Sequence, residues 1–177
     1  HSFESIWNKN ANPKSTSYAI EAITMILQNV ELLKQKPLDI DIRNNLLIAS
    51  NKAGLAFSNT KTAAAHSISY PLTLNYNVPH GIASSLALIS LLKINRIHIL
   101  EELNEILDTL RYKDIDELII NIKKIPLGFL KYSLKEWGVK KNQLNGLVNQ
   151  SFTKDRMNNN IIKLKENDVR LILNDVF

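Results

Sequence analysis

The chain has 177 residues, of which 45% are hydrophobic and 22% charged, with a formal net charge of +5 and no cysteine. This length fits one domain with a sizeable core, and the lack of cysteine leaves His, Asp and Glu as the metal-ligating side chains. The lysines are scattered among acidic residues without interleaved aromatic side chains, which argues against nucleic-acid binding. No segment is typical of a membrane-spanning helix or a signal peptide, so we expect a soluble, cytoplasmic protein.

Helical periodicity is present from the start of the chain. The segment before residue 13 reads as helical, although no capping residue precedes it. An apolar stripe with steps of three and four residues predicts a first long helix, opened by Pro13 and ended near Pro37. A second helix is predicted from Asp39 to Phe57, with Gly54 where another backbone could approach closely.

The rest of the chain is predicted to form shorter helices. One should begin at Pro79-His80-Gly81 and end near Asn95. Five more are predicted at His98–Leu110, Asp114–Lys124, Phe129–Trp137, Gln143–Ser151 and Asn167–Val176. No strand-like alternation persists and no repeat or linker divides the chain. We therefore expect one all-α domain over residues 1–177.

Two of the four histidines, His66 and His80, lie in the segment AAAHSISYPLTLNYNVPHGIASS. Imidazole is the commonest metal ligand in proteins, but a divalent ion needs three or four ligands, so two histidines alone do not make a site. His80 follows Pro79 at a predicted helix start, where the helix dipole disfavours imidazolium and keeps a nitrogen lone pair available. His98 has no companion and is expected to be an ordinary polar residue, and His1 by itself could be a tag remnant.

Residues 53–85, AGLAFSNTKTAAAHSISYPLTLNYNVPHGIASS, together with HSFES and NPKSTSYAIEAITMI near the start, resemble the C-terminal helical domain of the iron-containing (group III) alcohol dehydrogenases. The resemblance covers the whole chain and implies a dehydroquinate synthase-like helical fold. It also implies that His1, His66 and His80 are ligands of a divalent metal ion, iron(II) or zinc. A further Asp ligand and an N-terminal dinucleotide-binding domain would both precede the first residue, so the chain resembles half an enzyme.

Tyr70 stands where many members of that family have another histidine. A phenol can donate and accept a hydrogen bond, but its pKa near 10 makes it a poorer proton shuttle at neutral pH. Two roles therefore stay open for Tyr70: a catalytic one, in orienting the substrate or relaying a proton, and that of a wall residue beside the cofactor. Phe57 could likewise line a pocket or belong to the core.

The resemblance implies the metal-binding half of an NAD(P)-dependent alcohol dehydrogenase or aldehyde reductase, in which the metal acts as a Lewis acid during hydride transfer. The implied partners are a small alcohol or aldehyde, the absent dinucleotide-binding domain and further copies in a homo-oligomer. WNKNANP and HSISYPLT are most similar to the phosphonoacetaldehyde-reducing branch, where Arg156 or the amides at Gly81 could bind the phosphonate. A short-chain alcohol or diol dehydrogenase is the alternative.

Other classes of protein also stay open. A binding or regulatory helical domain would keep the helices without a common focus for its histidines, and a structural fragment would need the absent half for stability. Dehydroquinate synthase and glycerol dehydrogenase relatives share the fold, but VPHG and AFSNT favour the iron-containing branch. Because this chain has no Gly-rich phosphate-binding turn after a strand, we expect it to be inactive by itself.

Overall fold

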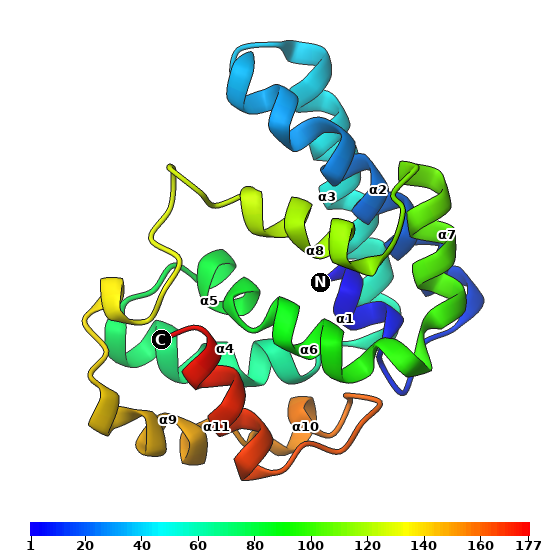
Figure 1. Ribbon diagram of the computed structural model, residues 1–177. Coiled ribbons are helices and arrows are strands. Elements are labelled where there is room, and N and C mark those ends of the chain that lie inside the picture. Colours follow the sequence, from blue (N-terminus) through cyan, green and yellow to red (C-terminus); the bar gives the residue numbers. More distant parts are fainter.

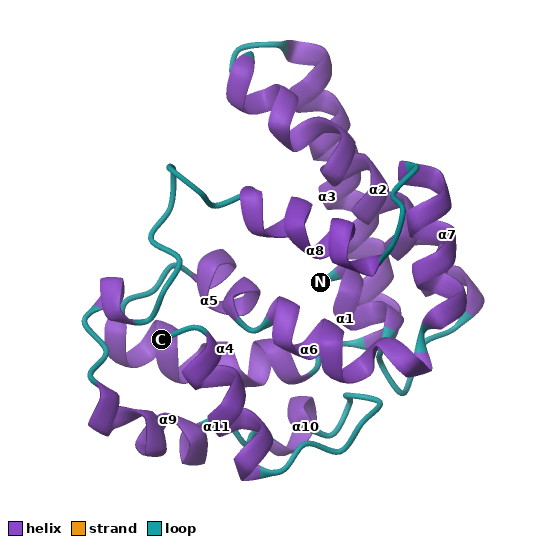
Figure 2. Ribbon diagram, viewed as in Figure 1, coloured by secondary structure: helices purple, strands orange, loops and turns teal.

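The computed structural model describes the backbone of residues 1–177 and all side chains except that of Lys154. The α-helices are α1 Ser2–Ile6, α2 Pro13–Gln35, α3 Ile40–Thr60, α4 Ala64–Tyr76, α5 His80–Leu86, α6 Leu88–Asn95, α7 Leu100–Leu110, α8 Ile115–Lys124, α9 Leu144–Gln150, α10 Lys154–Met157 and α11 Glu166–Asp175. Short 3-10 turns lie at Arg96–His98, Lys135–Trp137 and Lys141–Gln143. Within the described residues there is no strand, only one bridge between Asn8 and Asn160, which confirms the all-α prediction (Figure 2).

Helices α2 and α3 form a long hairpin that projects from the rest of the molecule (Figure 1). α2 begins with a reciprocal capping box, in which the Asn12 side chain accepts from the Ser15 backbone N–H at 3.1 Å and Ser15 Oγ accepts from the Asn12 N–H at 3.0 Å. The Asp39 side chain caps α3 in the same way, accepting from two backbone N–H groups. These caps place both helix starts where the sequence predicts them.

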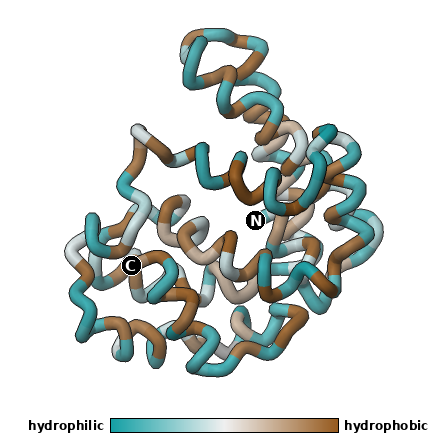
Figure 3. The backbone as a smooth tube through the Cα atoms, viewed as in Figure 1, coloured by the Kyte–Doolittle hydropathy of each residue, from teal (hydrophilic) through white to brown (hydrophobic). Residues whose placement is uncertain are grey.

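The body of the molecule contains the core, below the base of the hairpin. Polar and apolar residues alternate at short intervals along the helices, as amphipathic helices require (Figure 3). The largest fully buried side chains come from α4, α6, α7, α8, α9 and α11 and from the segments beside the helices; they are Trp7, Ile68, Leu72, Leu91, Leu92, Ile99, Ile106, Leu118, Leu134, Leu147, Ile172 and Leu173. The hairpin tip is exposed by contrast, with Leu38 84% accessible.

The segment after α1 is bonded to the C-terminal part of the chain. The Lys9 N–H donates to Asn159 O at 2.8 Å, and the Ile161 N–H donates to Trp7 O at 3.0 Å. The Asn159 side chain donates to Thr62 O at 2.8 Å, between α3 and α4. These bonds bring three distant parts of the chain to one place, beside the start of α4.

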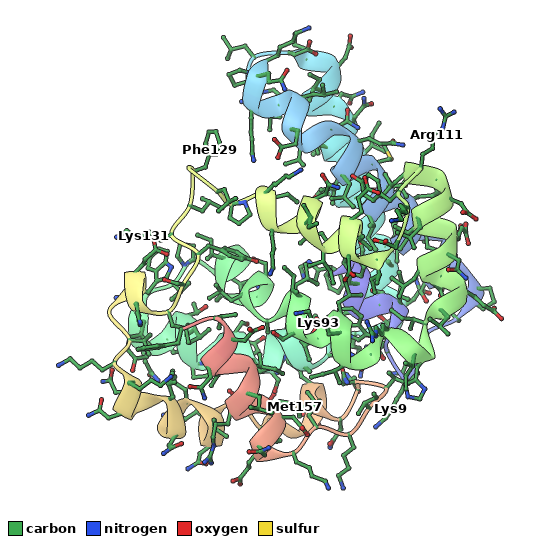
Figure 4. All side chains as sticks on the ribbon, in the orientation of Figure 1. Lys9, Lys93, Arg111, Phe129, Lys131 and Met157 are labelled. Atoms are coloured by element: carbon green, nitrogen blue, oxygen red, sulfur yellow. The ribbon has the colours of Figure 1, made fainter. Side chains whose placement is uncertain are left out.

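The predicted helix Phe129–Trp137 is wrong. Residues 126–134 form turns, followed only by the 3-10 turn Lys135–Trp137. Pro126 cannot donate within a helix and Gly128 has a φ of 77°, which is left-handed. Phe129 is 66% exposed at the outer end of the loop (Figure 4), and Leu130 is 49% exposed, so these two side chains supply no buried helix face.

The predicted helix from His80 to Asn95 is present as two helices, α5 and α6, divided at Ala87. Ser85 Oγ donates to the backbone of its own helix, and such bonds compete with the helical ladder. At the break, Ser85 O accepts from the Ala87 N–H and from the Tyr132 hydroxyl, the latter at 2.7 Å. Ala87 is itself buried, so the break lies inside the core.

The segment between His66 and His80, where no helix is predicted, is for the most part the helix α4. Pro71 lies inside α4 and is buried, where the packing of neighbouring Ile68 and Leu72 in the core offsets the lost backbone bond. α4 ends at Asn77 in the left-handed conformation, with a φ of 53°. Gly54 differs from expectation as well: a Cβ placed there would have no neighbour within 4 Å.

The remaining predicted helices are present as α7, α8, α9 and α11, with ends within two residues of the prediction, and α10 is an additional short helix. No single helix of the described chain is long and apolar enough to cross a membrane. One pair bent by 115°, His80–His98 with Leu100–Leu110, reaches that length and composition only when the two parts are taken together.

Candidate functional site

His66 lies in the first turn of α4, and its ring is fixed by a buried carboxylate from α1. His66 is 4% and Glu4 2% exposed. One Glu4 oxygen accepts from the His66 backbone N–H at 3.2 Å, and the other is hydrogen-bonded to His66 Nδ1. His66 Nε2 is buried and has no hydrogen-bond partner among the described residues. A buried imidazole with one nitrogen on a carboxylate and the other without a partner has the arrangement of a metal-ligating histidine.

The rings of His1 and His80 both lie close to the ring of His66. The ring centroids are 4.5 Å apart for His1 and His66, and 5.2 Å apart for His66 and His80. His1 precedes α1 and stacks on the Phe57 ring at 4.3 Å, while His80 is the first residue of α5. Three elements therefore bring the three predicted ligands together.

The described side chains fit a metal ion in donor type but not as a finished coordination shell. Three imidazoles and the unpartnered His66 Nε2 are the nitrogen donors that iron(II) and zinc accept. Still, no group of three or more His, Asp or Glu side chains within the described residues has a ready metal-binding arrangement. The role of His1, His66 and His80 as ligands therefore stays a prediction.

Two side chains at this cluster, Glu4 and His80, have lowered pKa values. Burial raises the pKa of Glu4, but the hydrogen bond and the charge of His66 outweigh it, so the pKa lies below its usual value. Desolvation and the neighbouring His66 lower the pKa of His80. The direction for His80 matches the prediction, although the main cause is desolvation rather than the helix dipole.

Two cavities meet at the three histidines. The larger, of ≈ 870 Å³, is mainly polar; it is lined by His1, Asn10, Phe57, Ser58, Lys61, Thr62, His66, Tyr70, His80, Asp155, Arg156, Asn158 and Asn159. The smaller, of ≈ 290 Å³, is mainly apolar and is enclosed by residues of α1, α2, α5 and α8. A ligand in either cavity would reach the histidine cluster.

Tyr70 and Arg156 lie together in the polar cavity. The Arg156 guanidinium carbon is 4.6 Å from the centre of the Tyr70 ring, and the Tyr70 and His80 ring centres are 6.5 Å apart. Phe57 is half-buried and lines the same cavity, so it is a wall residue rather than part of the closed core. His98 lies in an exposed turn and lines neither cavity, as predicted for an ordinary polar residue.

Two features of the site were not predicted from the sequence: the partner of Glu4, a residue that with His1 matches the family's ligand pattern, and the backbone conformation of Lys61. The contact of Glu4 with His66 joins residues 62 positions apart, and its only local signal is an acidic residue among Phe3, Ile6 and Trp7. Lys61 has a φ of 66°, and its carbonyl is held by the buried side chains of Asn8 and Thr60. A lysine gives no sequence signal for that backbone conformation, which is rare outside glycine.

The fold is that of the helical half of metal-dependent alcohol dehydrogenases. The chain superposes on a crystal structure of 1,3-propanediol oxidoreductase with a TM-score of 0.89 at 22% identity, covering 100% of this chain and 49% of that one. The sulfoacetaldehyde reductase of Bifidobacterium kashiwanohense, solved with NAD⁺, matches with a TM-score of 0.86 at 25% identity, over 99% of this chain and 46% of that one.

Residues 1–177 match the Fe-containing alcohol dehydrogenase family, C-terminal. The chain belongs to this family. It is 29% identical to the 4-hydroxybutyrate dehydrogenase of Clostridium kluyveri over 81% of this chain and 41% of the relative, and 31% identical to the 1,3-propanediol dehydrogenase of Citrobacter freundii over 68% and 33%. The phosphonoacetaldehyde reductase of Streptomyces viridochromogenes is 30% identical over 52% of this chain and 23% of the relative. The chain thus spans less than half the length of these relatives.

Proposed function

We propose that residues 1–177 are the metal-binding half of an NAD(P)-dependent alcohol dehydrogenase or aldehyde reductase. The observation that carries the proposal is the buried His66 Nε2, which has no partner in the described chain and belongs to a ring close to those of His1 and His80. An unpartnered buried nitrogen costs free energy, so its retention indicates a ligand. Family membership supports the same conclusion.

Each residue has a defined part in this proposal. His1, His66 and His80 hold a divalent ion, iron(II) or zinc, which supplies Lewis acidity at an alcohol or aldehyde oxygen. Glu4 keeps the His66 ring oriented and its Nδ1 protonated. Phe57 forms a wall of the polar cavity, and Tyr70 orients the substrate or relays a proton. The dinucleotide cofactor would be bound by a domain outside this chain, and that domain would determine the preference between NAD and NADP.

Under this proposal the substrate is a small alcohol or aldehyde. The enzyme is cytoplasmic. Phosphonoacetaldehyde is one candidate, because a relative reduces it and because the polar cavity contains Lys61 and Arg156. A short-chain alcohol or diol is the other, supported by the propanediol dehydrogenases among the relatives and by the mainly apolar second cavity.

Metal binding tests the proposal directly. The full-length protein should bind one Fe²⁺ or Zn²⁺ per chain, and His66→Ala should weaken that binding by at least about tenfold, measured by competition with a chelator. The matched control is His98→Ala, which removes an exposed imidazole outside both cavities and should leave the affinity unchanged. Equal affinities in the wild type and His66→Ala would contradict the proposal.

Cofactor-linked turnover is the second test. The metal-loaded full-length protein should oxidise short alcohols with NAD or NADP, whereas the 177-residue chain alone should not, since it has no phosphate-binding turn. The rival assignment to a non-catalytic helical binding domain predicts no turnover by either form. Turnover by the 177-residue chain alone would show that the cofactor site lies within these residues.

A further inference from the structure

We propose that Arg156 is the specificity-determining residue of this site and binds an anionic group at the far end of the substrate. The inference rests on the proposed function, because it assigns the reacting end of that substrate to the histidine cluster. The ligand class is a short aldehyde or alcohol that ends in a carboxylate or phosphonate.

Arg156 lines the polar cavity and forms no ion pair with another described residue. It is half-buried, and no described carboxylate lies within ion-pair distance of its guanidinium. Asp155 lines the same cavity but forms no ion pair with it. Arg156 contacts the aromatic ring of Tyr70. This contact uses none of the guanidinium N–H groups that would donate to a carboxylate. The N–H donors of Arg156 are thus free of any acidic partner in the described chain.

Hydrogen bonds attach the segment before Arg156 to the helix that carries His66. Ser67, which follows His66 in α4, is fully buried and donates from Oγ to Ser151 O at 2.5 Å. The same Oγ accepts from the Thr153 backbone N–H at 3.2 Å. The segment that leads into Arg156 is therefore attached to the residue next to His66, which limits the distance between cation and metal ligands.

Lys61 adds a second cation to the same cavity. Its φ of 66° lies in the left-handed region, which is unfavourable for a residue with a Cβ. The surrounding bonds maintain it: Asn8 and Thr60 side chains donate to Lys61 O at 3.1 and 3.0 Å. Together Lys61 and Arg156 give the lining of the polar cavity two positive charges, against the single carboxylate of Asp155.

The spacing suits a short substrate. Arg156 is 4.6 Å from the Tyr70 ring centre, and that ring centre is 6.5 Å from the centre of His80. A molecule whose oxygen lies at the imidazoles needs only a few carbon–carbon bonds to place an acidic group at the guanidinium. An uncharged substrate of equal length would leave this cation without a counter-charge in a partly desolvated position.

The test compares charged and uncharged substrates of similar length on the metal-loaded full-length protein. The first pair is phosphonoacetaldehyde and propionaldehyde, and the second is 4-hydroxybutyrate and 1-butanol. The first pair tests for recognition of a phosphonate and the second for recognition of a carboxylate. At least one anionic member should have a kcat/KM about tenfold or more above its partner, because a charge-assisted pair contributes that much. Arg156→Gln should reduce this ratio by about tenfold, mainly through KM, and Arg156→Lys by less, because the charge is retained.

A binding measurement supplies a readout that needs no turnover. Propylphosphonate, which has no reacting oxygen on carbon, should bind to the wild type about tenfold more tightly than to Arg156→Gln in calorimetry. Arg170→Gln, on the exposed face of α11, is the control and should match the wild type. Turnover of uncharged substrates without an anionic preference would overturn this inference and leave the proposed function intact. No turnover of any of the four compounds would count against both.

Discussion

Glu4 and His66 form a carboxylate–imidazole pair inside the molecule, with the carboxylate bonded to both the backbone N–H and the ring Nδ1 of the histidine. They come from α1 and α4, and both are nearly inaccessible. The pair fixes which ring nitrogen is protonated, so the other nitrogen presents its lone pair to the cavity. It also joins the two helices that carry His1 and His66.

Replacement of Glu4 by Gln should weaken metal binding. Gln preserves the shape and one acceptor oxygen but removes the charge that favours a protonated Nδ1, so the metal affinity should fall by about 10–100-fold. Chelator competition on the full-length protein measures the change. Glu21→Gln, at an exposed position in α2 where the carboxylate pairs with Lys52, should leave the affinity at the wild-type value. An affinity unaffected by Glu4→Gln would exclude a role for this carboxylate at the metal.

Tyr70→Phe separates the two roles open to this residue. The ring and its contact with Arg156 are retained while the hydroxyl is lost, so we expect kcat to fall by about tenfold or more and the pH profile to change, as for loss of a proton-transfer group. Tyr76→Phe, at the end of the same helix, is the matched control. If kcat and its pH dependence stay at wild-type values, Tyr70 is only a wall of the cavity.

Ser67→Ala should destabilise the fold. The substitution leaves the Ser151 carbonyl and the Thr153 N–H without the Ser67 hydroxyl, so the free energy of unfolding should drop by about 1–3 kcal/mol. Urea denaturation measures this. Ser17→Ala, whose exposed hydroxyl bonds only to Glu21, should change stability by less than about 0.5 kcal/mol. A similar loss for both variants would mean that the buried Ser67 hydroxyl contributes no more to the free energy of unfolding than an exposed one.

Glu136 should contribute to the acid sensitivity of the fold. Its carboxylate accepts from Ser133 Oγ and from the backbone N–H groups of Tyr132 and Ser133, each at 2.9 Å, and these bonds lower its pKa. A lowered pKa favours the ionised form in the folded state, so the contribution is present above the ordinary Glu pKa of about 4.3 and is lost as the pH falls through the folded value.

The measurement compares the free energy of unfolding of the wild type and Glu136→Gln at pH values on both sides of that range. The wild type should lose more stability on acidification than Glu136→Gln, and the two should converge at the acidic end. Glu105→Gln, at an exposed position in α7, should follow the wild type. Parallel acid profiles for the wild type and Glu136→Gln would disprove the assignment.

The amino-acid sequence by itself determined the helical class, most helix positions and the residues to consider as ligands. Caps such as Asn12 and Asp39 and regular apolar spacing act within a few residues, so they are readable in the chain. The prediction failed where distant contacts decide. The Tyr132 hydroxyl donates to the Ser85 carbonyl at the break between α5 and α6, and burial keeps Pro71 within α4.

Only the tertiary structure decided what surrounds the histidines. The bond between Glu4 and His66, the contact of Arg156 with Tyr70 and the backbone of Lys61 each join or depend on residues far apart in sequence. Local propensity carries no information on such pairs, because their free energy comes from desolvation and contacts that exist only after the helices have packed. The chain therefore names the candidate ligands, while packing sets their protonation, their orientation and the charge of the cavity that they share.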